Sequence, residues 1–476
     1  MTAYVFSGTK IVSGNGYNLV AGDSLHTLAG SVLQSTGGNG VFANGGVNIQ
    51  VDGDVEGAVY EGFAGIDDVA GAGDSTGITV NGSVGGLVGI SVMAGPNSLP
   101  GAVHNIVNSG TITGSNDPFA RGSAIEVDGG GRIVNQASGK LSGTDAIVDT
   151  DASSGDINSF VNYGLVEAQP AYFIHSPFPL GGYAFVGGSD REAVYNIGGA
   201  IFGNVSMSGD KADVLYNAAW MIGFSKSLVN LGCFNVENST VVNVSGGGMY
   251  EGVNDSLVGV DMMTFGDANK DYLYNAGLVD EVSNSGNGNP ASNAVLFGAG
   301  AADGLYNDSG GEVYGNVQLG SGAGQGVFNA GTIDGTVKLG DGAGDYYDGP
   351  AGKEIGGIVC GNGGDYVFTG SGVEVVTAGL GNDYFAMANG GETVIQELGA
   401  YQQSNGVDAI ANFQTYNAAT AQGTFLHLDA SMAGATNFYD YNGGTLVQMN
   451  LGGGNYSYID VLNTAVATVQ AQTYYG

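Results

Sequence analysis

Residues 361–394 read GNGGDYVFTGSGVEVVTAGLGNDYFAMANGGETV, and this stretch has a nine-residue periodicity. Its acids recur at a constant step, at Asp365, Glu374, Asp383 and Glu392. A glycine lies two positions before each acid, and an apolar residue lies two positions after it. The apolar residues are Val367, Val376, Phe385 and Val394. Three residue types in phase over four cycles predict short strands joined by glycine turns, stacked repeat upon repeat.

A second periodicity lies upstream. The dipeptide Val-Asn recurs at one constant spacing, at 80–81, 107–108, 134–135 and 161–162. Each copy belongs to a short alternating apolar run that ends in Gly, Asn or Ser, which is typical of a strand followed by a turn. A coil of this length made of short strands predicts a right-handed parallel β-helix with three faces per coil. We expect its valines to stack inside as a continuous core.

From about residue 190 the repeated motif becomes an acid followed by apolar-aromatic-Asn. It occurs at 192–196, 213–217, 271–275 and 303–307, and at 325–329 with Gln in place of the acid. The same position then recurs at 345, 365 and 383, so the coil shortens progressively toward the C-terminal end. The shortest coil, from 365 to 383, has room for two faces, so we expect the stack to narrow from three faces to two.

A second acid follows the motif position at the same nine-residue step in each of these later coils. These second acids are Asp280, Glu312, Asp334, Glu354, Glu374 and Glu392. We expect them to stack along the edge opposite the first acids.

The composition restricts the classes of partner. The 476-residue chain has 90 glycines and a formal net charge of −35, from 45 acids and 10 basic residues. Nucleic acid and anionic membrane surfaces both require a basic patch, so neither is an expected partner. So large a negative charge with so few basic residues predicts bound cations. The chain has no apolar run long enough to span a membrane, and its start, MTAYVFSGTK, lacks the features of a cleavable signal peptide.

The turns of the nine-residue repeats have the chemistry of a hard-cation site. Stacking places CGNGGD (360–365) under AGLGND (378–383). Glycines let carbonyl oxygens converge on a common centre, and each turn adds a carboxylate. About six to eight oxygen ligands suit Ca²⁺ rather than Zn²⁺ or Mg²⁺. The four histidines are isolated, and we expect Cys233 and Cys360 to be unpaired, with metal ligation by them less favoured.

The stretch resembles the glycine-rich nonapeptide of repeats-in-toxin (RTX) proteins, G-G-x-G-x-D-x-apolar-x, whose known form is a parallel β-roll that binds Ca²⁺ between turns. The match is strong at 361–369 and 379–387, fair at 370–378 and 388–396, and partial at 303–360. The resemblance implies Asp365 and Asp383 as the leading metal ligands. The carbonyl groups around Gly361, Gly363, Gly379 and Gly381 are implied as further ligands, followed by Asp345, Asp303 and Asp271. Glu374, Glu392, Glu354 and Asp334 are implied more weakly. The alternative interpretation of these acids is a solvated edge.

The tail carries a second resemblance. VDAIANF, LHLDASM and YIDVLNTA, with a glycine-rich turn between, are similar to the uncleaved C-terminal domain of proteins exported by type I secretion. The chain is therefore predicted to be all-β, a parallel β-helix narrowing into a β-roll with a β-rich cap. The predicted segments are 1–45 as an N-terminal cap or assembly segment, 46–300 as the β-helix, 301–395 as the RTX-like β-roll, and 396–476 as the cap and secretion-like domain.

An enzyme is the less favoured class. The sequence has no H-E-x-x-H and no G-x-S-x-G, and NDPF at 116–119 lacks the nearby basic residues that a polyuronate site needs. The leading hypothesis is a secreted calcium-binding structural protein that assembles with copies of itself, as a surface-layer or filament subunit, after export by type I machinery. The alternative is an adhesin that binds a cell-surface glycan through tyrosines at the repeated motif. Those tyrosines, Tyr195, Tyr216, Tyr274 and Tyr306, are expected to form a ladder, on a face that the sequence leaves open.

Overall fold

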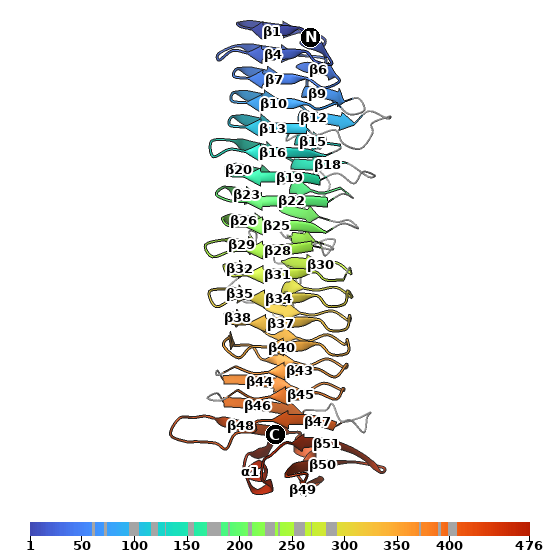
Figure 1. Cartoon of the computed structure of the whole chain (residues 1–476), viewed down its shortest axis with the longest axis vertical. Coiled ribbons are helices and arrows are strands. Elements are labelled where there is room, and N and C mark those ends of the chain that lie inside the picture. The colour runs from blue at the N-terminus through green and yellow to red at the C-terminus, as the bar shows by residue number, and fades with distance from the viewer. Residues whose placement is uncertain are drawn as a thin grey trace, which may run out of the picture. The chain divides into compact units, whose positions relative to one another are not determined.

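The computed structural model is built almost entirely of β-strands, which confirms the predicted all-β class (Figure 1). It describes residues 1–59, 62–70, 74–94, 104–115, 122–128, 130–150, 157–168, 182–188, 191–207, 212–223, 234–236, 239–251, 262–267, 269–281, 293–370, 373–388, 392–397 and 407–476. The chain divides into two compact units, one of residues 1–242, 247–260 and 283–285, the other of 243–246, 261–282 and 286–476. Cys233, His175 and the NDPF stretch lie outside the described residues.

The first unit is a parallel β-helix with three sheets. Figure 1 shows its successive strands, such as β4, β7 and β10, lying side by side. Its first sheet contains β1 (Ala3–Phe6), β4 (Ser24–Thr27), β7 (Asn48–Val51), β10 (Gly77–Val80), β13 (His104–Asn108), β16 (Gly131–Asn135), β19 (Ile157–Asn162), β22 (Arg191–Asn196), β25 (Asp213–Asn217) and β28 (Ser239–Asn243). Its second sheet contains β2 (Thr9–Val12), β5 (Val32–Ser35), β8 (Asp54–Glu56), β11 (Ser83–Gly85), β14 (Thr111–Thr113), β17 (Lys140–Gly143), β20 (Leu165–Ala168), β23 (Ala200–Phe202), β26 (Trp220–Gly223) and β29 (Gly248–Glu251). Its third sheet contains β3 (Tyr17–Val20), β6 (Val41–Asn44), β9 (Ala64–Ala70), β12 (Val88–Ala94), β15 (Ser123–Val127), β18 (Asp145–Asp149), β21 (Tyr183–Val186), β24 (Asn204–Met207) and β27 (Phe234–Val236).

The second unit also begins with three strands per coil. Its first sheet contains β31 (Tyr272–Asn275), β34 (Gly304–Asn307), β37 (Gly326–Asn329), β40 (Tyr346–Asp348), β43 (Tyr366–Phe368), β45 (Tyr384–Ala386) and β47 (Val407–Ala411). Its second sheet contains β32 (Leu278–Asp280), β35 (Glu312–Tyr314), β38 (Thr332–Asp334) and β41 (Lys353–Glu354). Its third sheet contains β30 (Met263–Phe265), β33 (Asn293–Leu296), β36 (Asn316–Gln318), β39 (Val337–Lys338), β42 (Ile358–Val359), β44 (Val373–Thr377), β46 (Glu392–Glu397) and β48 (Gly423–Leu428).

The stack narrows from three faces to two, as predicted. Among the described residues the second sheet has no strand after β41, whereas the first continues through β43 and β45 and the third through β44 and β46. The narrowing follows from coil length. Tyr366 is already aligned with Tyr384 in the next coil, and the segment between them is too short for three strands and their turns.

The end of the second unit combines parallel and antiparallel pairing. Strand β51 (Asn455–Val461) adds to β47 in parallel, and β52 (Thr473–Tyr475) adds to β48 in parallel. Between them, β49 (Thr436–Tyr441), β50 (Gly444–Gly452) and β51 form an antiparallel meander. A 3₁₀ turn (Ala430–Met432) and a short helix, α1 (Val466–Ala471), complete this segment. Among the described residues no helix is long and apolar enough to cross a membrane.

Apolar side chains stack in register to form the core. In the first unit one such line runs through Leu25, Ile49, Ile78, Ile106, Ile133 and Phe160. In the second unit the equivalent line is Leu273, Leu305, Val327, Tyr347, Val367 and Phe385. Every one of these side chains is buried. Stacking like residues on neighbouring coils lets each add to the same continuous core.

The Val-Asn repeats are oriented differently from the expectation. In three of the four copies the asparagine (Asn108, Asn135 and Asn162) points inward and is fully buried, whereas Asn81 is exposed. Val107 and Val161 are only half-buried. Side chains alternate along a strand, so Asn108 shares the inward face with Ile106, and Val107 takes the other face. The first copy is also out of step, since Val80 rather than Asn81 is aligned with Asn108.

The buried asparagines form ladders that satisfy their own amides. The Nδ2 atom of each residue donates to the Oδ1 atom of the next at 2.9 Å, along Asn108, Asn135, Asn162, Asn196 and Asn217 in the first unit. The second unit repeats this through Asn243, Asn275, Asn307 and Asn329. A buried polar group with a partner on the neighbouring coil avoids the cost of an unmade hydrogen bond.

Candidate metal centre

The first acids of the repeats occupy one stacked position in the second unit, which we call the acid column. It consists of Asp271, Asp303, Gln325, Asp345, Asp365, Asp383 and Asp408. All seven side chains are buried, and none is more than 6% exposed. The first acids of the repeats, which include the leading predicted ligands, are therefore inside the coil and do not form a solvated edge.

Main-chain hydrogen bonds set the position of each carboxylate in the acid column. The N–H of Gln325 donates to Asp345 Oδ1 at 2.9 Å, and the N–H of Asp365 donates to Asp383 Oδ1 at 2.9 Å. The same bond joins Asp271 N–H to Asp303 Oδ1 at 3.0 Å. Each of these side chains thus reaches back toward the preceding coil and lies between two coils.

The glycine turns bring main-chain carbonyl groups close to the acid column. A Cβ atom on Gly361 would lie 1.7 Å from the carbonyl oxygen of Gly340, and one on Gly379 would lie 1.5 Å from that of Gly361. Gly363 meets the carbonyl of Gly342 in the same way, whereas the nearest atom to Gly381 is the nitrogen of Gly364. Only glycine permits this approach, so the carbonyl of one coil faces the turn of the next.

The predicted glycine ligands also donate hydrogen bonds. The N–H of Gly361 donates to Asp365 Oδ2 at 2.8 Å, and the N–H of Gly379 donates to Asp383 Oδ2 at 2.9 Å. These bonds hold the carboxylates beside the turns. Asp365 Oδ1 accepts no hydrogen bond from the described residues, although it is buried.

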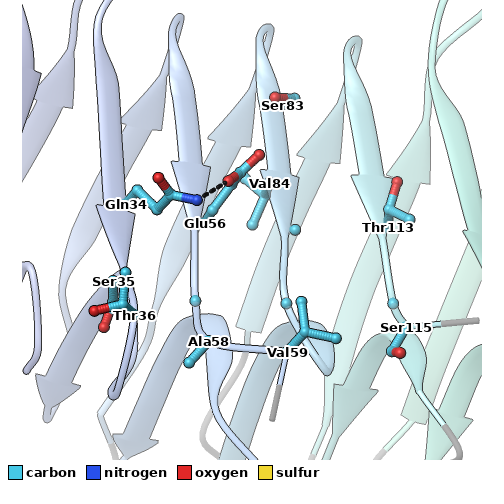
Figure 2. Close-up of a pocket in the computed structure, with 14 residues that line it drawn as sticks. Gln34, Ser35, Thr36, Glu56, Ala58, Val59, Ser83, Val84, Thr113 and Ser115 are labelled. Carbon is cyan, nitrogen blue, oxygen red and sulfur yellow. Dashed lines mark hydrogen bonds between the residues drawn. The ribbon is translucent and has the colours of Figure 1, made fainter. Parts of the chain in front are cut away.

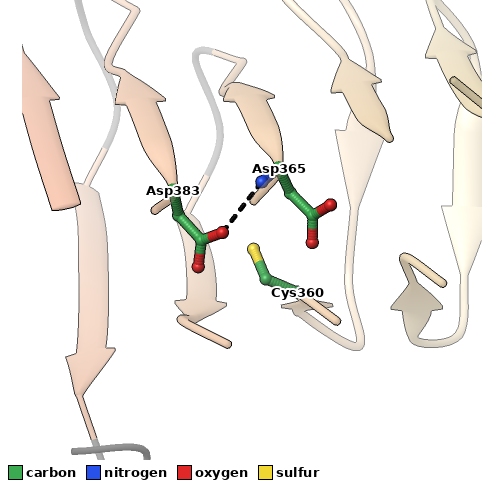
Figure 3. Close-up of side chains that lie close together, drawn as sticks. All are labelled: Cys360, Asp365 and Asp383. Carbon is green, nitrogen blue, oxygen red and sulfur yellow. Dashed lines mark hydrogen bonds between the residues drawn. The ribbon is translucent and has the colours of Figure 1, made fainter. Parts of the chain in front are cut away.

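Cys360 completes a three-residue cluster with Asp365 and Asp383. Its sulfur and a carboxylate oxygen from each aspartate lie within 4.8 Å of one another, and all three residues are buried. Figure 3 shows the sulfur between the two aspartates. From the sequence alone, metal ligation by this cysteine is the less favoured expectation. The available signal was its place directly before Gly361, which matches Ala378 before Gly379 in the next coil.

Burial and mutual repulsion make these carboxyl groups hard to ionise. Burial raises the pKa of Asp365 to about 7, against the lowering effect of the Gly361 N–H, and the neighbouring carboxylates of Asp383 and Asp345 raise it further. Burial likewise raises the pKa of Asp345 to about 6. No described lysine or arginine lies within ion-pair distance of the acid column. A bound cation would favour the ionised form of these carboxyl groups, and their oxygen-rich surroundings are of the kind that Ca²⁺ prefers.

The second acids do not form a matching column. Glu374 is aligned with Thr393, and Glu392 with Val373, so the fourth repeat is displaced by one residue. The same displacement puts Ile395 rather than Val394 in line with Val376 in the core. A shift of one residue exchanges the two faces of a strand, which explains why Glu392 is half-buried while Glu374 is fully buried.

The remaining second acids have separate environments. Asp334 is exposed and aligned with Tyr314, whereas Glu354 is aligned with Ile333 and buried. Glu354 accepts a hydrogen bond from the Gly357 N–H at 2.6 Å, and Glu374 accepts one from the Gly370 N–H at 3.0 Å. Burial raises the pKa of both glutamates to about 7. Each accepts hydrogen bonds from its own turn, although the charge of Glu374 adds to the raised pKa of Glu354.

The first unit contains a related acid pair that the sequence analysis did not nominate. Glu192 and Asp213 occupy the motif position of β22 and β25, and the Glu192 N–H donates to Asp213 Oδ1 at 2.9 Å. Both side chains are fully buried, and burial followed by the charge of Asp213 raises the pKa of Glu192. The acid-apolar-aromatic-Asn motif at 192–196 was the signal that could have found this pair.

A surface pocket on the second sheet of the first unit has a different character. Its lining includes Gln34, Glu56, Ser83, Thr113 and Ser115. Figure 2 shows the Gln34 amide directed at Glu56, whose Oε2 accepts a hydrogen bond from Gln34 Nε2 at 3.0 Å. Glu56 is the single ionisable side chain in the described lining. The pocket therefore offers hydroxyl and amide contacts and no pair of groups for acid–base chemistry.

The motif tyrosines form ladders on the outward face of the first sheet. In the second unit the rings of Tyr274 and Tyr306 are stacked at 4.9 Å, and Phe328 continues the line at 6.4 Å. Tyr274 is 42% exposed. In the first unit Tyr195 and Tyr216 are 6.2 Å apart. The sequence left the face of the ladder open, and the structure places it toward solvent.

Comparisons with known protein families, with curated proteins and with solved structures found no match to this chain. The RTX resemblance therefore stays a prediction, and function is argued from the geometry.

Proposed function

We propose that this is a secreted, calcium-binding structural protein that assembles with copies of itself at the cell exterior, as a subunit of a surface layer or filament. The observation that carries the proposal is the acid column: buried carboxylates, stacked coil upon coil, with no basic partner among the described residues. Ca²⁺ between coils would neutralise these carboxylates and hold each coil to the next. The protein's stiffness would then depend on the metal.

Calcium dependence accounts for when such a chain would fold. Extracellular-type sites bind Ca²⁺ at about 10⁻⁴–10⁻³ M, well above what the cytosol supplies. Without the metal, the buried carboxylates and a net charge of −35 oppose compaction. The chain would be only weakly stable before and during export through the type I machinery that its tail predicts, and it would reach its full stability outside.

Self-assembly is supported by open strand edges. Among the described residues, β1, β2 and β3 each pair with one neighbour, and Val5, Ile11 and Val20 are exposed there. At the other end of the chain, β49 pairs with β50 alone within the described part and exposes Tyr439 and Tyr441. Open edges with exposed apolar side chains favour contact with another copy, and contact between unlike ends gives an open chain of subunits.

A Ca²⁺ titration of the purified chain tests this proposal, with circular dichroism and light scattering recorded together from chelator to about 10 mM, a span that brackets such affinities. We expect the β-structure signal to increase, and large particles then to appear, in the millimolar range. A chain that is fully folded in chelator and monomeric at every Ca²⁺ concentration would refute both the metal sites and the structural role.

The outward tyrosine ladder favours a second candidate, an adhesin that binds a neutral glycan. Stacked, half-exposed rings such as Tyr274 and Tyr306 offer apolar faces with hydroxyl edges, which suit sugar rings. Binding of neutral oligosaccharides by the folded protein, lost in the Tyr274→Ala, Tyr306→Ala double variant, would support this function. A particle-forming chain without such binding would favour the structural role.

A further inference from the structure

Gln325 interrupts the acid column with a neutral side chain. Its Nε2 atom donates to the carbonyl oxygen of Gly298 at 2.9 Å, to that of Gly300 at 2.5 Å, and to Asp303 Oδ2 at 2.9 Å. Gln325 is fully buried. An amide nitrogen carries two hydrogens, yet three oxygens converge on it. Such an oxygen cradle suits a centre of positive charge better than a neutral donor.

The same cradle recurs one coil later. Gly320 lies directly against the Gly298 carbonyl, and Gly322 against the Gly300 carbonyl, since a Cβ on either would lie 1.7 Å from that oxygen. The next pair, Gly340 and Gly342, is packed in the same way against the carbonyls of Gly320 and Gly322. The carbonyls of Gly320 and Gly322 are therefore placed for Asp345 as those of Gly298 and Gly300 are for Gln325.

Asp345 faces its cradle with an acceptor instead of a donor. Its Oδ1 accepts the Gln325 N–H, and its buried Oδ2 accepts no hydrogen bond from the described residues. The buried Oε1 of Gln325 also accepts none from them. The nearby N–H groups of Gly340 and Gly342 lower the pKa of Asp345, but they leave its Oδ2 without a completed hydrogen bond. A cation among such carbonyl and carboxylate oxygens would relieve their mutual repulsion. The interval between Gln325 and Asp345 therefore has room in its chemistry for an ion, whereas the amide already fills the interval between Asp303 and Gln325.

We infer that the Gln325 amide is a built-in substitute for a cation: it closes the position between Asp303 and Gln325 to metal, and the cation-binding part of the acid column begins with Asp345. This inference rests on the proposed calcium binding. It removes Asp303 Oδ2 from the set of ligands, because the Gln325 amide nitrogen stands where a cation would meet that oxygen. The coils joined by Gln325 hold together in chelator, and the coils that follow require Ca²⁺.

A reciprocal pair of substitutions in the full chain tests the inference. Gln325→Asp shortens the side chain, removes the amide and recreates the Asp345 arrangement, so it should add about one bound Ca²⁺ per chain. Asp345→Gln should remove about one, because its amide can fill the cradle. Gln318→Asp is the matched control, since it makes the same charge change on a half-buried position of the same coil outside the acid column. Bound Ca²⁺ is counted by equilibrium dialysis with Mg²⁺ in excess, which occupies unspecific acidic sites.

Thermal unfolding in chelator gives a second readout that needs no bound metal. We expect Gln325→Asp to melt at a lower temperature than wild type and Asp345→Gln at a higher one, with Gln318→Asp unchanged. An unchanged Ca²⁺ count together with an unchanged melting temperature for Gln325→Asp would overturn the inference. If wild type binds no Ca²⁺ but Gln325→Asp gains an ion, the amide does substitute for a cation, but the proposed calcium function and the assignment of a cation site at Asp345 both fail.

Discussion

Replacing Asp365 by asparagine should change the stability of the protein in opposite directions with and without Ca²⁺. Asp365 is fully buried between the carboxylates of Asp345 and Asp383, and its Oδ1 accepts no hydrogen bond from the described residues. Asparagine has nearly the same shape and keeps an oxygen for the Gly361 N–H. The substitution removes the negative charge. In wild type that charge costs free energy when no metal is bound, and it would bind the metal when Ca²⁺ is present.

The size of both effects follows from the site. A pKa raised from 3.8 to about 7 corresponds to on the order of 2–4 kcal/mol of destabilisation above pH 7, with the lower figure allowing for solvent screening. Asp365→Asn should therefore be more stable than wild type in chelator at pH 8. In Ca²⁺ at about 100 times Kd, wild type gains about 2.7 kcal/mol per ion, and the variant should lose most of one such gain.

Thermal and denaturant unfolding at pH 8, in chelator and in about 10 mM Ca²⁺, measure both effects. Asp308→Asn, on an exposed turn of the same unit, is the matched control and should behave as wild type in both conditions. The reasoning is refuted if Asp365→Asn is less stable than wild type in chelator, or if Ca²⁺ stabilises it as strongly as it stabilises wild type.

Three further predictions concern other parts of the molecule. Folding raises the pKa of Glu192 above its ordinary value of 4.5. The protonated side chain therefore contributes stability below about pH 4.5, and this contribution is lost as the pH rises toward the raised pKa. In chelator, the free energy of unfolding of wild type should fall from about pH 5 to pH 8. For Glu192→Gln the slope of this free energy against pH should be shallower by up to about 1.4 kcal/mol per pH unit, and equal slopes would contradict the reasoning. Asn135→Ala removes three hydrogen bonds and should cost about 3 kcal/mol, measured by denaturant unfolding, whereas the exposed Asn105→Ala should cost under about 0.5 kcal/mol. Cd²⁺ should produce a thiolate charge-transfer absorption band in wild type, and Cys360→Ala should lack this band but keep its response to Ca²⁺. A band that persists in the variant would show that Cys360 is no ligand.

Much of the fold follows from the spacing of residues along the chain. The repeats determined the parallel stacking, the shortening of the coil and the loss of one of the three faces, because a strand and its turn need a minimum length of chain. They also determined that the acids at 303, 345, 365 and 383 share one position, since each is followed two residues later by an apolar or aromatic residue. Composition determined that few basic residues were available to neutralise them.

Register and facing direction were decided by the tertiary structure. A repeat length counts residues but does not say which neighbour each residue meets, and one extra residue exchanges the inward and outward faces. That is why Glu392 is displaced from Glu374, why asparagines at three of the four Val-Asn copies line the interior, and why the tyrosine ladder faces outward. The contacts of Gln325 and Cys360 depend on oxygens contributed by neighbouring coils. The sequence by itself determined which residues recur, and only the packing of coil on coil decided which of their atoms meet, because that depends on turn geometry and on close approach at glycines.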